Sequence, residues 1–405
     1  MTRPRALVIG LDANMDSTVL LSSETRAIML LCGHFGLKRG GSKPLTPTEY
    51  HRFVRWLEGR RGSLAELLDN DPRDTVRSYR DKEVGGQRLL DLLGRNAWLT
   101  QTLDRWARIG IWVMSEKDSD YPVRLRQRLK AAGAPLLFGA GPRQLLNEGG
   151  VCIVGSRDST DAGLAFARHL GGRTANEGFT VISSDMRGVD REAITAALAQ
   201  SGKVVSVVSD SLEKAVSARR NRNALAAGML VLVTPFAPDT RFNVSNAMRA
   251  NKYQYTLSDV AVIVETRRHG GVWLGADENR NEGWVPAFVR TGAQMAPGNT
   301  ALLHLGLLPI SEEDVRNSHN LVAQLLDRSR KENVVPVALP SDVRGVDLYS
   351  LFLAELLLFV ASEARSETDV MKHFALERSQ ARTWLARAYK DRRINKTGSP
   401  PRYRR

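Results

Sequence analysis

The segment at residues 151–157, Val-Cys-Ile-Val-Gly-Ser-Arg, constrains the fold more than any other part of the chain. Its apolar residues suit a strand that is buried on both faces, and Gly155 lets a ligand approach the backbone. A helical pattern begins near Asp161, and the first turn of that helix would aim free N–H groups at the loop. Arg157 adds a planar, permanent charge suited to phosphate oxygens. The segment fits the strand, loop and helix of a nucleotide-type fold, or an ordinary buried strand followed by a surface arginine.

Short apolar segments alternate with helical patterns further along the chain. The expected strands lie at residues 179–183, 203–208, 229–234, 260–265 and 284–289. This alternation predicts an α/β fold with an extended, Rossmann-like, mostly parallel sheet, whose ligands bind beyond the carboxyl ends of the strands. Polar and glycine-rich loops follow those ends, at residues 155–160, 183–190, 236–246, 267–275 and 291–300. We therefore expect a ligand site among these loops.

Length and composition set broad limits on the class of protein. A chain of 405 residues can form one sizeable core and two smaller domains. With 42% hydrophobic and 25% charged residues it is globular, and no apolar segment is long enough to span a bilayer, so we expect no membrane partner. The short apolar segment at residues 6–10 does not fit a secretory signal, which predicts a cytoplasmic protein. Cys32 and Cys152 predict reduced, buried thiols, and we expect neither a metal nor a cofactor.

Net charge points to a polyanionic partner. The chain carries a formal charge of +14 at pH 7, with a pI near 10.1. Nucleic acid is the commonest such partner, because lysine and arginine neutralise its phosphates and speed association. The alternative is a generally basic, solvated surface.

The basic residues gather most clearly near the carboxyl end. Residues 347–361, 367–374 and 377–390 read as three helices, with Ala381, Trp384, Leu385 and Ala388 at core spacing in the third. A basic tail follows at residues 392–405. This order predicts a winged-helix-like C-terminal domain, which could present its third helix to a DNA groove or bind protein instead.

The amino-terminal part reads as a small helical domain. Helical periodicity covers residues 24–37, 63–69, 75–79 and 87–109. A further helix opens at Thr46, where Pro47 suits the first turn and Glu49 can complete a capping box. We expect a helical N-terminal domain at 1–109, a central domain at 110–310, a linker at 311–345 and the winged-helix-like domain at 346–405.

The central motifs resemble a known family. In order along the chain, they lie at residues 118–122, 135–139, 154–157, 183–190, 242–252, 257–259, 270–276 and 298–299. Their order and spacing resemble those of the DNA-processing protein A family (DprA, also called Smf), whose members load a recombination protein onto incoming single-stranded DNA. The resemblance covers about half of the chain.

The resemblance implies a non-catalytic protein that binds single-stranded DNA, forms a homodimer through the α/β domain, and acts with a recombinase. Phosphates would meet backbone N–H groups and cations, and bases would stack on rings. Phe242, Tyr253, Tyr255 and Trp273 are the nearby rings, and both tyrosines fit the core equally well. The implied site residues are Gly155, Ser156, Arg157, Ser184, Arg187, Gly188, Phe242, Asn246, Arg249, Lys252, Gly270 and Gly271.

The chain also departs from the family pattern. Ser245, Asn246 and Ala247 stand where many members have Arg-Asn-Arg, and Ile194 replaces a histidine. These changes leave room for a second role, as a DNA sensor or as the antitoxin partner of a toxin protein in a phage-defence module. A third alternative is a nucleotide-phosphate ribohydrolase with Glu278 as its acid or base, although its loop lacks the expected threonine and a second carboxylate.

Overall fold

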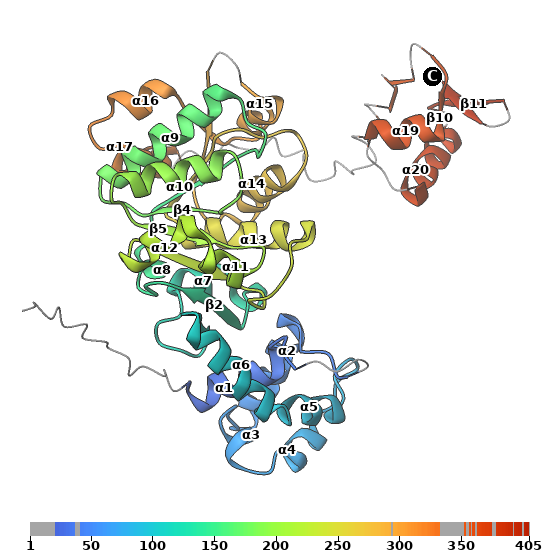
Figure 1. The fold of residues 1–405 in the computed structure, drawn as a ribbon. Helices are drawn as coiled ribbons and strands as arrows, with labels where there is room; N and C mark the ends of the chain where they lie inside the picture. Colours follow the sequence, from blue (N-terminus) through green and yellow to red (C-terminus); the bar gives the residue numbers. More distant parts are fainter. Residues whose placement is uncertain are drawn as a thin grey trace, which may run out of the picture. The chain divides into compact units, whose positions relative to one another are not determined.

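The computed structural model describes residues 21–36, 41–292, 295–332 and, with short gaps, 352–404. The chain forms two compact units, Met1–Lys331 and Glu332–Arg405. Figure 1 shows the helices and strands of each unit. No helix among the described residues is long and apolar enough to span a membrane.

The first unit is built on one large sheet. Its strands are β1 (Trp112–Ser115), β2 (Leu136–Ala140), β3 (Val151–Val154), β4 (Val181–Ser183), β5 (Val204–Val207), β6 (Leu230–Thr234), β7 (Val260–Ile263), β8 (Ala287–Arg290) and β9 (Leu308–Ile310). Their order in the sheet is β1-β2-β6-β5-β4-β3-β7-β8-β9. In this order, every neighbouring pair between β6 and β9 is parallel. Strands β1 and β2 add an antiparallel edge beside β6. The predicted mostly parallel, Rossmann-like sheet is confirmed.

The strand order reverses at β3. The chain builds outward through β4, β5 and β6, then crosses back to add β7, β8 and β9 on the other side of β3. Connections on either side of this point leave the sheet toward opposite faces, which opens a crevice at the carboxyl ends of β3 and β7. Both faces of β3 are buried, since Val151 and Ile153 join one apolar core while Cys152 and Val154 join another.

Helices cover both faces of the sheet (Figure 1). One face carries α9 (Asp161–Asn176), α10 (Val189–Ala199), α11 (Leu212–Ser217) and α12 (Arg219–Ala226). The other carries α7 (Val123–Leu129), the short 3-10 helix η1 (Lys130–Ala132), α8 (Leu145–Glu148), α13 (Val244–Leu257), α14 (Gly271–Glu282) and α15 (Pro297–His304). Residues of α13 and α14 pack against each other beside the crevice.

The amino-terminal region is helical, as predicted. Its elements are α1 (Ser23–Cys32), α2 (Pro47–Gly59), α3 (Glu66–Asp69), α4 (Arg73–Ser78), α5 (Gly86–Leu93) and α6 (Asn96–Arg108). The capping box that opens α2 is present: Thr46 Oγ1 accepts a hydrogen bond from Glu49 N, and the Glu49 carboxylate accepts one from Thr46 N. This reciprocal pairing is why α2 begins where the sequence places it.

The single helix expected over residues 87–109 is wrong, because the helix ends at Leu93 and a new one begins at Asn96. Arg95, which lies between them, is buried and donates hydrogen bonds to the backbone carbonyl oxygens of Leu30, Gly33 and Phe35. It thereby satisfies carbonyl groups at and beyond the end of α1. Closing that helix end requires the chain to bend at Gly94 and Arg95.

The helical region and the sheet share one apolar core. The Trp106 ring packs edge-on against Phe138 of β2, with 5.3 Å between ring centroids. Glu116, just after β1, accepts a hydrogen bond from Tyr50 Oη at 3.1 Å and lies 3.0 Å from His51 Nε2. These contacts place the helices and the sheet in the same compact unit.

The linker predicted over residues 311–345 is wrong for its first part. Residues 312–332 form α16 (Glu312–Asn317) and α17 (Leu321–Glu332). The Glu177 carboxylate accepts hydrogen bonds from Leu321 N and Val322 N, and both side chains are buried in the core. Burial of these two side chains packs α17 against the sheet domain. Residues 333–345 lie outside the described residues.

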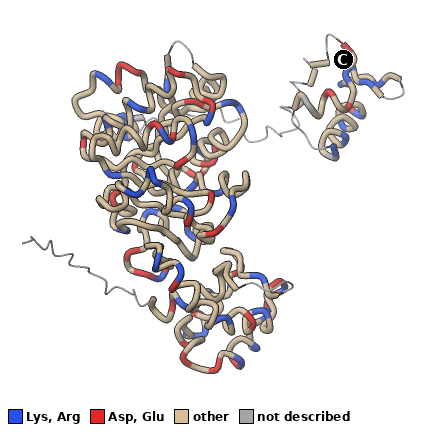
Figure 2. The backbone as a smooth tube through the Cα atoms, viewed as in Figure 1, with Lys and Arg blue, Asp and Glu red and all other residues tan. Residues whose placement is uncertain are grey.

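The C-terminal unit contains β10 (Arg365–Ser366), α19 (Glu367–Phe374), α20 (Arg378–Lys390), β11 (Asn395–Thr397) and β12 (Arg402–Arg404). Its three strands form an antiparallel sheet with β12 in the centre. Much of the helix expected at 347–361 lies outside the described residues, so the winged helix stays a prediction. Figure 2 shows many basic residues in this unit. Arg378 and Arg382 of α20 both pair with Glu367.

A buried asparagine joins the strands beside the crevice and gives a stability test. Asn299 Oδ1 accepts from Thr266 N at 2.9 Å, and Nδ2 donates to the carbonyl oxygens of Val264 and Arg290 at 2.9 and 3.0 Å. Asn299→Leu leaves all three buried backbone groups without a hydrogen-bond partner. It is expected to lower the free energy of unfolding by about 3 kcal/mol. Urea unfolding followed by circular dichroism measures this loss. A loss no larger than that of exposed Asn317→Leu would contradict it.

Candidate phosphate site at the strand reversal

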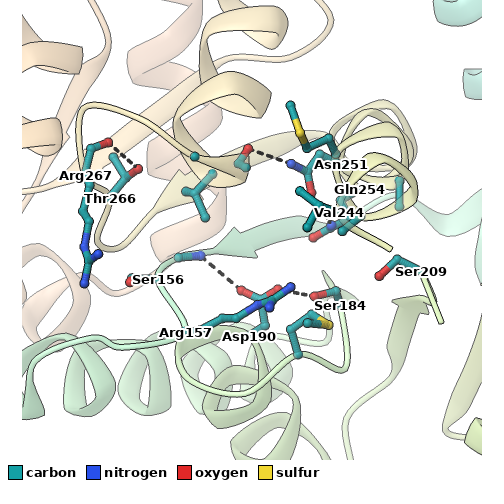
Figure 3. Close-up of a pocket in the computed structure, with 18 of the residues that line it drawn as sticks. Ser156, Arg157, Ser184, Asp190, Ser209, Val244, Asn251, Gln254, Thr266 and Arg267 are labelled. Atoms are coloured by element: carbon teal, nitrogen blue, oxygen red, sulfur yellow. Dashed lines mark hydrogen bonds between the residues drawn. The ribbon is translucent and has the colours of Figure 1, made fainter. Parts of the chain in front are cut away.

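A pocket of about 340 Å³ lies where the strand order reverses (Figure 3). Its walls come from the carboxyl end of β5, from the loops after β3, β4, β5 and β7, from α13 as far as Gln254, and from the first turn of α14. This is the position at which doubly wound α/β sheets bind their ligands. The sequence prediction of a site among these loops therefore corresponds to a real concavity.

The loop after β3 is held in place by Glu265. Glu265 O accepts a hydrogen bond from Ser156 N at 2.8 Å. Its buried carboxylate accepts from Ser159 Oγ at 2.7 Å and from Thr160 Oγ1 and N at 2.8 and 3.1 Å. The expectation that the first turn of α9 offers free N–H groups to a ligand is therefore wrong, because a carboxylate already lies there and the Thr160 hydroxyl caps Gly163 N.

Arg157 projects from this fixed loop with its charge free. It forms no ion pair among the described residues, and its guanidinium lies 5.1 Å from the centroid of the Phe242 ring. Phe242 is itself 39% exposed. A cation held over an exposed ring leaves both the positive charge and the other ring face available to a ligand.

The first turn of α14 supplies the helix terminus that the first turn of α9 does not. Gly270 precedes the helix with a φ of +95°, and no side chain caps the helix start. Gly270, Gly271 and Val272 all line the pocket. Uncapped N–H groups at a helix start favour anions, so this turn is suited to a phosphate group.

The loop after β4 brings a buried carboxyl group to the pocket wall. Asp190 accepts hydrogen bonds from Gly155 N at 3.1 Å and from Ser184 Oγ. Burial raises the pKa of Asp190 to about 7, although these hydrogen bonds and the charge of Arg157 oppose the rise. Gly188 has a φ of +93°, and a Cβ there would collide with the backbone of Ser156 and Arg157. The two loops can meet only with glycine at this position.

The structure brings together half of the predicted site residues. Those that line the pocket are Gly155, Ser156, Arg157, Ser184, Gly270 and Gly271. Three more lie next to lining residues without lining the pocket: Arg187 pairs with Asp158, Gly188 packs on the first loop, and Phe242 lies under Arg157.

Asn246, Arg249 and Lys252 lie elsewhere. They line a separate cavity of about 640 Å³ between α13 and the helical region. Their spacing of three residues puts them on one side of α13, whereas Ala247, Asn251 and Gln254, at spacings of four and three, face the pocket. The sequence therefore identified the correct helix and did not separate its two faces.

The other aromatic candidates belong to the core. Tyr253 and Tyr255 are buried, and Trp273 is partly buried against the same apolar cluster as Val289. Three further residues line the pocket and were not among the predicted site residues, namely Asn251, Gln254 and Ser209. The helical spacing of Asn251 and Gln254 was a usable indication, while Ser209 follows its strand without a recognisable motif.

Glu278 does not line the pocket, because it lies two turns into α14. The carboxyl groups that do line it belong to Asp158 and Asp190. Asp158 pairs with Arg187, and Asp190 is occupied by Ser184 and Gly155. The ribohydrolase alternative needs Glu278 in the pocket as its acid or base, and Glu278 is not among the residues that line the pocket.

The sheet domain is similar to known proteins. A family model described as DNA recombination-mediator protein A matches residues 112–310. Protein Smf of Synechocystis is 24% identical over 284 residues, which cover 67% of this chain and 70% of that protein.

One solved structure shows the same fold, and a second is more distantly similar. DNA processing protein A (DprA) of Streptococcus pneumoniae superposes with a TM-score of 0.53 at 19% identity, over 66% of this chain and 90% of that one. DNA processing protein A of Helicobacter pylori, described with its single-stranded DNA binding mode, gives a TM-score of 0.46 at 20% identity, over 54% and 96%. The family match begins at the first residue of β1 and ends at the last of β9, so it spans the whole sheet. Through this sheet domain, the chain belongs to the DNA recombination-mediator protein A family.

Proposed function

We propose that this protein binds single-stranded DNA in the pocket at the strand reversal and acts in DNA processing without catalysing a reaction. The observation that carries the proposal is the placement of Arg157. Its unpaired guanidinium lies over Phe242 and lines the same pocket as the uncapped first turn of α14. A phosphate can be bound by the cation and the helix start while a base stacks on the ring.

The apolar rim of the pocket favours a single strand over a duplex. Phe242, Val244 and Met248 are exposed large apolar side chains around the start of α13. Bases reach such a surface only when they are unpaired and turned outward, since a duplex presents its phosphates and hides its base faces. The pocket volume of about 340 Å³ also suits a nucleotide rather than a helix of paired strands.

The arrangement of carboxyl groups supports a binding role. Both Glu265 and Asp190 use their oxygens to hold backbone and hydroxyl groups of the loops after β3 and β4. A general base needs an oxygen that can reach a proton of the substrate. These two groups instead shape a surface for an anion. Membership of a recombination-mediator family makes a recombinase the partner and a homodimer the assembly that we propose.

Arg157→Ala tests the proposal directly. We expect affinity for a single-stranded oligonucleotide to fall about ten-fold, since one charge-assisted contact is lost. The slope of log K against log salt should become shallower by about 0.7, as for one phosphate contact fewer. Fluorescence anisotropy across a salt series measures both quantities.

Arg316→Ala is the matched control, because Arg316 is an exposed arginine of α16 that pairs with Glu312. It should leave affinity and salt slope unchanged. Equal binding by wild type and Arg157→Ala, or tighter binding of duplex than of single strand by wild type, would contradict the proposed site.

The raised pKa of Asp190 predicts weaker DNA binding at higher pH. Asp190 is neutral below about pH 7 and charged above it, and a charged carboxylate beside the phosphate costs about 1 kcal/mol. Affinity should therefore fall about five-fold between pH 6 and pH 8. The folded state should also lose stability as pH rises from the ordinary value of 3.8 to about 7.

Asp190→Asn should flatten the pH dependence of both quantities, as measured by anisotropy and by urea unfolding. His269 also lines the pocket, so His269→Gln separates its share. A pH profile that is unchanged in Asp190→Asn would show that Asp190 does not control binding.

A further inference from the structure

We infer that the inner wall of the pocket reads a nucleobase through Gln254 and selects bases that carry an exocyclic amine. The inference rests on the proposed function, since it specifies which part of the strand enters the pocket. It assigns sequence preference to a site whose other groups, Arg157 and the start of α14, recognise phosphate without regard to the base.

Gln254 has a hydrogen-bonding group that the folded chain does not use. The residue is 3% exposed and lines the pocket from α13, yet its Oε1 has no hydrogen-bond partner among the described residues. A buried acceptor left unpaired is unfavourable and rare in native proteins. Figure 3 shows Asn251 and Gln254 entering the pocket opposite Ser156, Arg157, Ser184 and Asp190.

Neighbouring hydrogen bonds determine which end of the amide is free. The carbonyl oxygen of Gly271 can only accept, so Asn251 must direct its Nδ2 there, at 2.7 Å. Asn251 Oδ1 is then the group nearest to Gln254, and it draws the Gln254 Nε2 toward it at 3.5 Å. The remaining atom of the amide is the oxygen, so the unpaired group is an acceptor.

The surroundings of this acceptor fit a flat, polar-edged ring. Val207, Val244 and Ala250 line the pocket and provide apolar contact. Ser209, which is 5% exposed, also lines the pocket, and its hydroxyl forms no hydrogen bond within the described part of the chain. Apolar walls with two free polar groups are typical of sites that bind a small ring and fix its orientation.

An acceptor at this position discriminates between bases. Adenine, cytosine and guanine each carry an amine that can donate to Gln254 Oε1. Uracil and thymine carry carbonyl oxygens beside their ring N–H, and a carbonyl oxygen facing Oε1 leaves two acceptors in contact. The ring N–H of uracil and thymine is a donor too, but it lies between two carbonyl oxygens, so an acceptor placed to meet an exocyclic amine meets one of these oxygens instead.

The test compares oligo-dC with oligo-dU of equal length at pH 8, where the two differ in the donor and acceptor pattern of one pyrimidine edge. Wild type should bind oligo-dC about ten-fold more tightly. Gln254→Met removes the acceptor while nearly keeping side-chain length, and it should bind both oligonucleotides equally, at about the affinity of wild type for oligo-dU. Arg157→Ala should weaken both and keep the preference.

Thermal unfolding of the free protein provides a second readout. Because Gln254→Met removes an unpaired buried oxygen, this variant should melt at or above the wild-type temperature.

The binding outcomes separate this inference from the proposed function. If wild type binds oligo-dC and oligo-dU equally, and Arg157→Ala still shows the expected fall in affinity, the inference is overturned and the proposed function stands. A preference that survives in Gln254→Met would overturn the role of Gln254. Failure of wild type to bind either strand would overturn both proposals.

Discussion

The carboxylate of Glu265 is the group on which the geometry of the pocket depends. It follows β7 in sequence, yet it closes the start of α9, which belongs to the neighbouring β3 unit. Because Ser156 N also bonds to the Glu265 backbone, the two sides of the strand reversal are tied at their carboxyl ends. Without this link, the two loops would diverge with their helices. The positive end of the α9 dipole, which would attract a phosphate, is thus paired with the Glu265 carboxylate.

Because Glu265 already lies at the start of α9, the proposed anion site lies across the crevice, at the start of α14. The uncapped start of α14 and the guanidinium of Arg157 then line one pocket from the neighbouring strands β7 and β3. Asp190 joins the β3 and β4 loops in the same way that Glu265 joins β3 and β7. Carboxyl groups organise the scaffold, and cations and backbone N–H groups are left for the ligand, which is the division expected of a protein that holds a strand of phosphates.

The sequence predicted the centre of the fold well and its edges poorly. Strands such as β3 are apolar on both faces and are bounded by glycine, so composition alone marks them. The antiparallel edge strands β1 and β2 were not predicted as strands, since β2 joins the sheet through β6, which lies about ninety residues further along the chain, and β1 pairs only with β2. Arg95 could not be recognised as a buried residue, because its partners are carbonyl oxygens of a distant helix end.

Site prediction reached the loops and was incomplete on α13. A loop glycine soon after an apolar strand, with an arginine nearby, has a local sequence signature, which is why Gly155, Arg157 and Gly270 were among the predicted site residues. The division of α13 into a face toward the pocket and a face toward the helical region depends on how the helix is rotated against the sheet. That rotation is set by packing against α7 and α14 rather than by the residues of α13 alone.

The apolar core that the helices α1–α6 share with the sheet has a consequence for how the chain is made. The surfaces around Trp106 and Tyr50 gain their partners Phe138 and Glu116 only after β1 and β2 exist. During synthesis the helical region therefore emerges with part of its apolar surface uncovered, and it completes its packing against a sheet edge that is itself antiparallel to β6 and finished late. The two regions are expected to acquire their final stability together, as one cooperative unit.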